Sequence, residues 1–382
     1  MHECPVENRR RKEHGGLILQ KTHRGKELRT GFTTGSCATA ATKGALLSIL
    51  SGKPQREVKI ALPAGFEATF SLVNVSISGN SASAEVIKDA GDDPDVTNGA
   101  TIRSTVFLHT GNDIVITGGE GIGTVTKPGL PVQVGESAIN PTPMRMIRSE
   151  ISRALVQNNV RDIGIKVVIS IPNGEEIARK TLNPRLGIVG GLSILGNLGI
   201  VKPYSSSAFM ASIAQSINVA RAMKRSEIVM TIGGRSEKYA MKLFPELNEE
   251  CFIEMGNFIG FSIKQAKTRG FSRIHLVGMP AKFSKIANGD MDSHSSRSGV
   301  DHNFLMSIGR ETGIKDLSIF EKGNTLSKIL ESMTESVRQR FFSRMAQLCS
   351  VACERHANGG ISVDTTIIDP SGTVLGRSAN DR

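Results

Sequence analysis

Apolar positions recur with two different spacings in the part of the chain that precedes Val160. Small and apolar side chains follow the spacing of a helix over residues 36–50, and again over residues 144–158 after a proline-rich loop. Between the two helices, β-branched or apolar side chains alternate with polar ones, which is typical of strands, at residues 56–63, 66–78, 81–90, 100–110 and 113–119. One helix, several strands and one helix predict an α+β domain over residues 29–160.

The pattern changes after residue 160. Short apolar runs that end in glycine or proline predict strands at residues 164–172, 185–195, 227–234 and 273–280. Helical patterns lie at residues 205–223, 236–244, 250–270, 282–288 and 326–356. Alternation of strands and helices predicts an α/β domain with a mainly parallel sheet over residues 161–382. A hairpin over residues 362–376 is expected to close the chain.

Positive charge is concentrated at the start of the chain but is not confined to it. The formal net charge is +11, and residues 1–30 hold eight Lys/Arg against four Glu. We expect residues 1–28 to form a flexible basic tail, and the rest of the chain stays basic, which attracts anions. Aromatic residues, on which nucleic-acid binders stack bases, make up only 4%. The composition therefore favours an anionic small molecule and no nucleic acid, while a polyanion or nucleic-acid binding module stays the alternative.

The cysteines and the apolar runs bear on the compartment of the protein. Five scattered cysteines do not suggest a disulfide framework. Cys349, Cys353 and His356 share one face of a predicted helix, and we interpret them as core residues. Residues 1–16 lack the apolar run of a signal peptide, and residues 186–201 are too interrupted by glycine to span a bilayer. We therefore expect a cytoplasmic protein with no membrane partner.

Glycines and hydroxyls crowd the segment that precedes the first predicted helix. Ser36 alone suits an N-cap. Capping does not account for the neighbouring small residues, which can offer N–H groups and hydroxyls to a carboxylate at the helix N-terminus. Cys37 has no histidine near it in sequence, so we interpret it as a buried small residue. The candidate substrate-binding residues of this segment are Gly31, Thr33, Thr34, Gly35 and Ser36.

Four glycines between residues 118 and 123 follow another predicted strand. The Gly-rich loop of a dinucleotide-binding protein or a class I methyltransferase runs directly into a helix. Here β-branched residues and two prolines follow instead, so the sequence argues against a class I Rossmann methyltransferase. A hairpin tip and a flexible flap over a ligand, carrying Glu120 and Lys127, both stay open.

Polar side chains are crowded between residues 282 and 302. Two histidines and three aspartates in this segment match no zinc or EF-hand spacing, and we predict no protein-bound metal. Histidine titrates near neutral pH and suits acid–base chemistry. We interpret the segment as an active-site loop in which His294 is the acid–base residue and Asp292 lies beside it. An ordinary solvated loop is the alternative.

Seven segments together resemble one known family. In chain order they are TGFTTGSCATAATKGA, KDAGDDPDVTNGA, GGEGIGTVTKPGLP, AINPTPMRMI, LNPRLGIVGGLSILG, MGNFIG and VGMPAKFSKIANGDMDSHSSRSGVD. From about Arg29 to the C-terminus the chain resembles the CbiD family, the cobalt-precorrin-5B C1-methyltransferases of anaerobic cobalamin biosynthesis. Asn197 and Leu198 depart from the family pattern, in which two threonines are expected. Any ligand contact made through those two hydroxyls is lost here.

The resemblance implies a reaction and its ligands. A methyl group passes from S-adenosylmethionine to ring carbon 1 of a broad, flat corrinoid, which converts cobalt-precorrin-5B to cobalt-precorrin-6A, and the cobalt belongs to the substrate. Lys282 and Arg297 are candidates to bind the substrate's carboxylates. Asp92, in an acidic turn, is a candidate for the adenosyl ribose, although the turn can also be purely structural. The other candidate donor-binding residues are Gly190, Gly191, Gly233, Gly234 and Gly278. Association into a homo-oligomer is left open.

Overall fold

The computed structural model describes residues 19–21, 27–292, 300–321 and 333–378. The contacts between Cα atoms divide the chain into two compact units, residues 1–205 and 206–382. Within the described ranges, no helix has an apolar stretch long enough to cross a membrane.

The first unit extends further along the chain than the sequence pattern indicates. We expected it to end at residue 160, but β11 (Ile163–Ser170) pairs with β8 (Thr101–Thr110) and with β9 (Ile114–Gly118). The apolar run of β11 therefore completes the first sheet instead of starting a second one.

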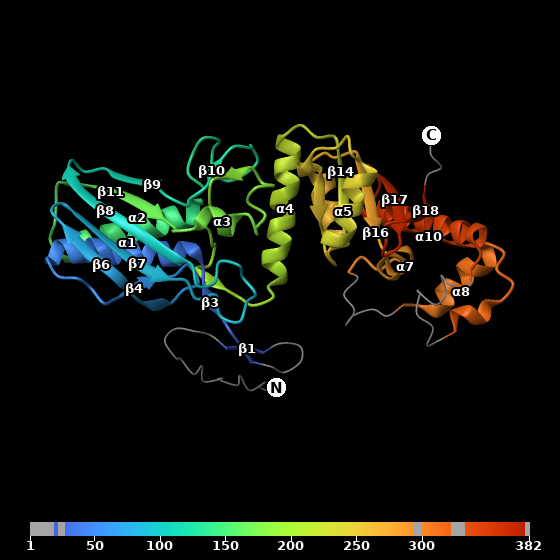
Figure 1. The fold of residues 1–382 in the computed structure, drawn as a ribbon, viewed down its shortest axis with the longest axis horizontal. Coiled ribbons are helices and arrows are strands. Elements are labelled where there is room, and N and C mark those ends of the chain that lie inside the picture. The colour runs from blue at the N-terminus through green and yellow to red at the C-terminus, as the bar shows by residue number, and fades with distance from the viewer. Residues whose placement is uncertain (1–18, 22–26, 293–299, 322–332, 379–382) are drawn as a thin grey trace, which may run out of the picture. The chain divides into compact units, whose positions relative to one another are not determined.

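A five-stranded sheet in the order β6–β7–β8–β11–β9 forms the centre of the first unit (Figure 1). Neighbouring strands are antiparallel except β11 and β9, which are parallel. The first two strands in this order are β6 (Val73–Ser78) and β7 (Ser81–Ile87). Four short antiparallel pairs complete the unit: β1 (Leu19–Lys21) with β2 (Glu27–Arg29), β3 (Gly31–Phe32) with β13 (Ile200–Val201), β4 (Glu57–Ala61) with β5 (Glu67–Ser71), and β10 (Thr124–Val125) with β12 (Ile188–Val189). The segment that we expected to be a flexible tail therefore includes paired strand residues.

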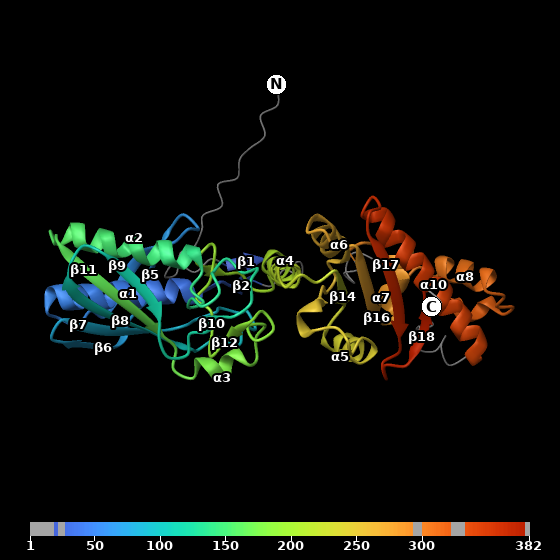
Figure 2. The same ribbon diagram turned by 90° about the horizontal axis from the view of Figure 1, so that it is seen from above.

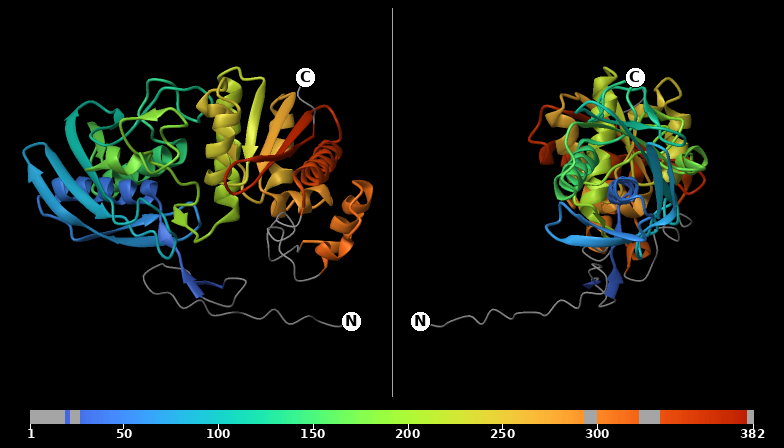
Figure 3. Two further views of the ribbon diagram at one scale, coloured as in Figure 1. Left: turned by 45° about the vertical axis from the view of Figure 1, so that its right-hand side comes forward. Right: turned by 90° about the vertical axis from the view of Figure 1, so that its left-hand side faces the viewer.

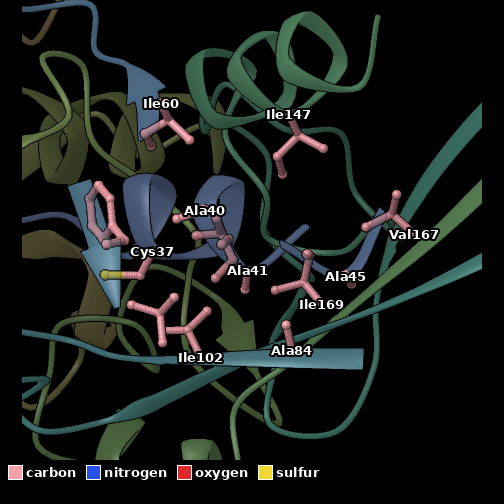
Figure 4. Close-up of a cluster of buried hydrophobic side chains, with 14 of the residues drawn as sticks. Cys37, Ala40, Ala41, Ala45, Ile60, Ala84, Ile102, Ile147, Val167 and Ile169 are labelled. Carbon is pink, nitrogen blue, oxygen red and sulfur yellow. The ribbon is translucent and has the colours of Figure 1, made fainter. Parts of the chain in front are cut away.

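Helix α1 (Thr34–Ser51) packs closely on this sheet because its buried side chains are small. Its contacts are with β7, β8 and α2 (Pro141–Gln157), and the unit also contains α3 (Gly174–Ala178). Figure 4 shows Cys37 and three alanines of α1 among isoleucines of the surrounding elements. Cys37 is 1% exposed, which confirms the prediction of a buried small residue, and burial raises the pKa of its thiol to about 12.

The second unit contains a five-stranded sheet in the order β15–β14–β16–β17–β18. The first four strands are parallel and β18 is antiparallel to β17, as expected for a mainly parallel sheet closed by a hairpin. Numbered along the unit, this order is 2-1-3-4-5 rather than the 3-2-1-4-5-6 of a Rossmann fold. The strands are β14 (Glu227–Thr231), β15 (Phe252–Glu254), β16 (Arg273–Gly278), β17 (Ser362–Ile368) and β18 (Val374–Arg377).

Helices cover both faces of the second sheet. Figure 2 shows α5 (Gly234–Leu243) on the side of the sheet opposite α6 and α10, and Figure 3 shows the β17–β18 hairpin in red beside α10. Cys349 and Cys353, on the buried face of α10, lie fully in the core, which confirms their interpretation as packing residues, whereas His356 at the end of α10 is only partly buried. The other helices of this unit are α4 (Ser206–Ala222), α6 (Ile259–Thr268), α7 (Pro280–Ala287), α8 (His302–Glu311) and α10 (Glu335–His356), with 3₁₀ turns at Glu249–Cys251 and Leu317–Phe320.

The segment of residues 250–270 differs from the single helix that its pattern predicts. Strand β15 pairs with β14 and buries Phe252 in the core, and α6 begins only at Ile259. Gly256, at a φ of +57°, turns the chain between the two elements. As a result, Glu254 lies at the carboxyl end of a parallel strand.

Candidate functional site

The carboxyl ends of β14 and β16 are neighbours in the middle of the second sheet. After β14 the chain passes through α5 to β15 on one side, and after β16 it continues through helices to β17 on the other side. Open α/β sheets bind ligands at such points, where successive connections leave in opposite directions. Gly233 and Gly234 follow β14, and Gly278 ends β16. Three of the glycines that we expected at the donor site are thus brought to one edge.

On the α5 side of this edge, two polar side chains share one face of the sheet. Thr231 and Glu254 are register partners on β14 and β15, so their side chains extend from the same face. A Cβ added to Gly233 would lie 3.6 Å from Glu254 Oε1, and one added to Gly234 would meet no atom of the described residues within 4 Å. Thr231 is fully buried, and its Oγ1 has no hydrogen-bond partner among the residues that the structure describes. Such a hydroxyl is unusual, because buried polar groups are almost always bonded.

On the α7 side of the edge, Lys282 lies in a polar cluster. Its Nζ donates a hydrogen bond of 2.6 Å to Asn257 Oδ1. Burial and then the neighbouring Lys285 lower the pKa of Lys282, while Asp292 acts in the opposite direction. The N–H of Gly260, at the start of α6, donates to the carbonyl of residue 291 and so holds the segment that leads to Asp292. Lys282 and Asp292, both predicted site residues, are therefore close neighbours.

His294 and Arg297, the remaining predicted residues of this segment, lie outside the described part of the chain. Their assignments as acid–base residue and carboxylate ligand stay predictions. Within the described ranges, no three metal-ligating side chains are clustered.

The predicted substrate loop of the first unit is closed by the protein's own backbone. Ser36 Oγ donates to a carbonyl of the loop of residues 193–199 at 2.6 Å, and Thr34 Oγ1 donates to another at 3.1 Å. Thr33, rather than Ser36, is the N-cap of α1, since its Oγ1 accepts from the N–H of Ser36 at 3.2 Å. The N–H of Gly35 donates to the same 193–199 loop. The hydroxyls that we expected to face a ligand are buried and bonded internally, and their role in substrate binding stays a prediction.

The acidic turn that contains Asp92 packs directly on this loop. A Cβ on Gly31 would lie 2.0 Å from the carbonyl carbon of Ala90, so only glycine fits there. The carboxylate of Asp92 accepts from the N–H of Arg29 at 2.7 Å, and the Arg29 side chain pairs with Asp89. The structure gives Asp92 a role in the turn, and its proposed contact with ribose is untested.

Gly190 and Gly191 belong to the first unit and not to the second, in which the sequence pattern placed them. They follow β12, and a Cβ on Gly191 would lie 2.2 Å from the carbonyl oxygen of Gly121. Gly191 and the glycine-rich segment after β9 thus pack backbone on backbone, whereas a Cβ on Gly190, at a φ of +85°, would meet no atom of the described residues within 4 Å. Neither residue lies on the sheet edge that carries Gly233.

Sequence reasoning missed Thr231, Glu254 and Asn257. One signal was available for Glu254. In mononucleotide-binding halves of α/β sheets, an acidic residue about 20 residues after the glycine loop binds ribose, and Glu254 follows Gly233 at a similar spacing. The helical pattern of residues 250–270 concealed it.

Comparison with known proteins determines the family of the chain. The family model CbiD matches residues 21–203, and the model of the CbiD C-terminal domain matches residues 292–379. The cobalt-precorrin-5B C(1)-methyltransferase of Priestia megaterium is 50% identical over 355 residues, which cover 92% of this chain and 96% of that protein. The chain belongs to the CbiD family.

Other members of the CbiD family match over similar lengths. The cobalt-precorrin-5B C(1)-methyltransferase of Geobacillus kaustophilus (strain HTA426) is 48% identical, and the alignment covers 92% of this chain and 95% of that protein. The protein of that name from Leptospira interrogans serovar Lai (strain 56601) is 40% identical, and the alignment covers 93% of this chain and 97% of that protein. A crystal structure of the cobalamin biosynthesis protein CbiD from Archaeoglobus fulgidus is 29% identical, covers 74% of this chain and 87% of that chain, and has a TM-score of 0.40.

Proposed function

We propose that this CbiD family member transfers a methyl group from S-adenosylmethionine to carbon 1 of cobalt-precorrin-5B. The observation that carries the proposal is the 50% identity to a methyltransferase of that name over 92% of the chain. An alignment of 355 residues includes parts of both units, so the activity is inferred for the whole chain rather than for one domain.

The reaction requires two bound molecules to be aligned. Ring carbon 1 supplies the electron pair for the new C–C bond. The bond between the methyl carbon and sulfur breaks, and S-adenosylhomocysteine leaves with the electron pair of that broken bond. Orientation of this kind can supply ~7–11 kcal/mol of the barrier. No nucleophile of the protein is needed, in agreement with a Cys37 thiol that is buried and protonated at neutral pH.

The carboxyl edge of the second sheet offers groups that suit this reaction. Lys282 can bind a carboxylate of the corrinoid, and its neighbour Asp292 can orient a proton-transfer group. We assign acid–base adjustment of the ring to His294, two positions further along, and a second carboxylate contact to Arg297. Cobalt enters as part of the substrate.

A labelled donor tests the proposed reaction. The protein is incubated with cobalt-precorrin-5B and S-adenosylmethionine that carries a ¹³C methyl group, and the product is analysed by mass spectrometry and NMR. We expect one labelled methyl on carbon 1 of the ring. A label on any other carbon, or an unlabelled product, contradicts the proposal.

Two substitutions test the roles of the loop after α7. His294→Ala and Asp292→Asn should each lower kcat by tenfold or more, because general acid–base catalysis contributes ~10²–10⁴ in rate. Asp290→Asn is the matched control, since Asp290 lies two positions from Asp292 and we give it no role. The assignment is wrong if His294→Ala turns over as fast as the control.

A further inference from the structure

We propose that the adenosyl group of the methyl donor binds on the α5 side of the second sheet. In this arrangement the carboxylate of Glu254 accepts hydrogen bonds from the ribose hydroxyls, and the Gly233–Gly234 turn lies against the nucleoside. The hydroxyl of Thr231 supplies a further polar contact beneath the turn. The inference rests on the proposed function, because that function identifies the donor.

The first support is the arrangement of β14, α5 and β15. A glycine turn follows the first strand, and the carboxylate of Glu254 lies at the end of the neighbouring parallel strand. An ionised carboxylate can accept from both hydroxyls of a ribose, and charge-assisted hydrogen bonds are stronger than neutral ones. The register pair of Thr231 and Glu254 places both side chains on the face that α5 covers.

The second support is the open space at the turn. Gly233 has an extended backbone, with φ at −179°, so its conformation does not require glycine. Among the described residues, a Cβ on Gly234 would meet no protein atom within 4 Å, and the nearest atom to one on Gly233 is the Glu254 carboxylate oxygen. Neither backbone strain nor packing within the described residues explains these two glycines. Close approach of a ligand to the backbone does explain them.

The third support is the hydroxyl of Thr231. A buried hydroxyl without a partner costs free energy, and this one, which has none among the described residues, lies two positions before Gly233 at the end of β14. A polar group of a ligand, or a water molecule held by that ligand, would satisfy it. This observation is independent of the glycines and of Glu254, and it marks the same place.

Charge separates the donor from the acceptor at this edge. Glu254 projects from the α5 face, whereas Lys282 and Lys285 belong to α7, which packs in the core of the opposite face. The donor carries a positive sulfonium, and the corrinoid carries several carboxylates. The Glu254 carboxylate therefore suits the donor, and the two lysines of α7 suit the acceptor.

Calorimetric titration with S-adenosylhomocysteine tests the inference. Glu254→Gln should weaken binding by tenfold or more relative to wild type, while Glu246→Gln, an exposed carboxylate of the same unit, should bind as wild type does. With the 2′-deoxyribose analogue of S-adenosylhomocysteine, Glu254→Gln should cause a clearly smaller loss of affinity, because one of the two hydroxyls that the carboxylate binds is absent. Equal affinity of Glu254→Gln and wild type for S-adenosylhomocysteine overturns the inference. So does a loss of affinity on Glu254→Gln that is as large for the 2′-deoxyribose analogue as for S-adenosylhomocysteine.

The outcomes separate the inference from the proposed function. If wild type does not bind S-adenosylhomocysteine, either alone or in the presence of the corrinoid, and transfers no labelled methyl group, the proposed function itself is contradicted. If wild type binds S-adenosylhomocysteine and Glu254→Gln binds it equally well, only the proposed location of the donor is contradicted. If Glu254→Gln fails to fold, Gly234→Ala replaces it. Its added methyl meets no atom of the described residues within 4 Å but should lower affinity for S-adenosylhomocysteine by tenfold or more, and unchanged affinity overturns the inference.

Discussion

The turn at Gly31 in the first unit and the Gly233–Gly234 turn in the second unit have opposite surroundings. In the first unit, a Cβ on Gly31 or Gly191 would lie 2.0 or 2.2 Å from backbone atoms, and the hydroxyl of Ser36 is bonded to the protein. In the described part of the second unit, a Cβ on Gly234 would meet no atom within 4 Å, and the hydroxyl of Thr231 has no partner. Composition alone therefore does not distinguish a packed turn from an open turn. The distinction lies in whether the protein's own chain fills the space.

The largest expected effect that separates the two regions is on stability. Gly31→Ala forces a methyl group into the backbone of Ala90, and we expect it to lower the free energy of unfolding by about 1–3 kcal/mol or more. Gly234→Ala is the matched control and should stay within about 0.5 kcal/mol of wild type. Chemical denaturation measures both values. Equal losses in the two variants would remove the contrast between the turns.

A smaller effect is expected from the two buried hydroxyls. Ser36→Ala removes a bonded hydroxyl and should lower the free energy of unfolding by about 1 kcal/mol. Thr231→Val removes a hydroxyl that has no partner among the described residues and should leave stability unchanged or raise it, because no hydrogen bond is lost. Denaturation in the absence of ligand measures the difference, and a larger loss for Thr231→Val than for Ser36→Ala would contradict the account.

The smallest effect is expected at acid pH in the first unit. Hydrogen bonds from Arg29 and then from the N–H of Gly91 lower the pKa of the Asp89 carboxyl. Because the pKa is lower in the folded state, the stabilisation is present above the pKa of the unfolded state and is lost as the pH falls through that of the folded state.

The contribution of this pair is less than about 1 kcal/mol, since both side chains are more than one-third exposed. The unfolding free energy of wild type should fall by this amount between about pH 5 and pH 3 as the Asp89 carboxylate is protonated, and Asp89→Asn should lack this contribution to the decline. Added salt should reduce the difference between the two proteins. A pH profile that is identical in wild type and Asp89→Asn would show that the pair contributes nothing.

Local patterns predicted much of the fold. The periodicity of residues 36–50 and the alternation at residues 362–376 correctly predicted α1 and the β17–β18 hairpin. Elements that depend on distant partners were not predictable in the same way. Strand β11 belongs to the first unit because it pairs with β8, which lies much earlier in the chain, and β15 is a strand because Phe252 pairs with β14. Neither pairing leaves a signal in the local sequence.

The candidate site was predictable only in part, for the same reason. Gly233 and Gly278 were found because a glycine at the end of an apolar strand, ahead of a helix, is visible in the sequence. Thr231 and Glu254 are brought together at the candidate site by the register of β14 and β15, which cannot be read from the sequence. The turn at Gly31 has equally suggestive residues, but contacts with residues 90 and 91 fill its space.

Hydrogen–deuterium exchange with and without saturating S-adenosylhomocysteine tests most directly whether the donor binds at the open turn of the second unit. We expect ligand to slow exchange in peptides that contain residues 231–237 and 254–258, and to leave residues 30–36 and 187–199 unchanged. Slowed exchange confined to the turns of the first unit would contradict the account.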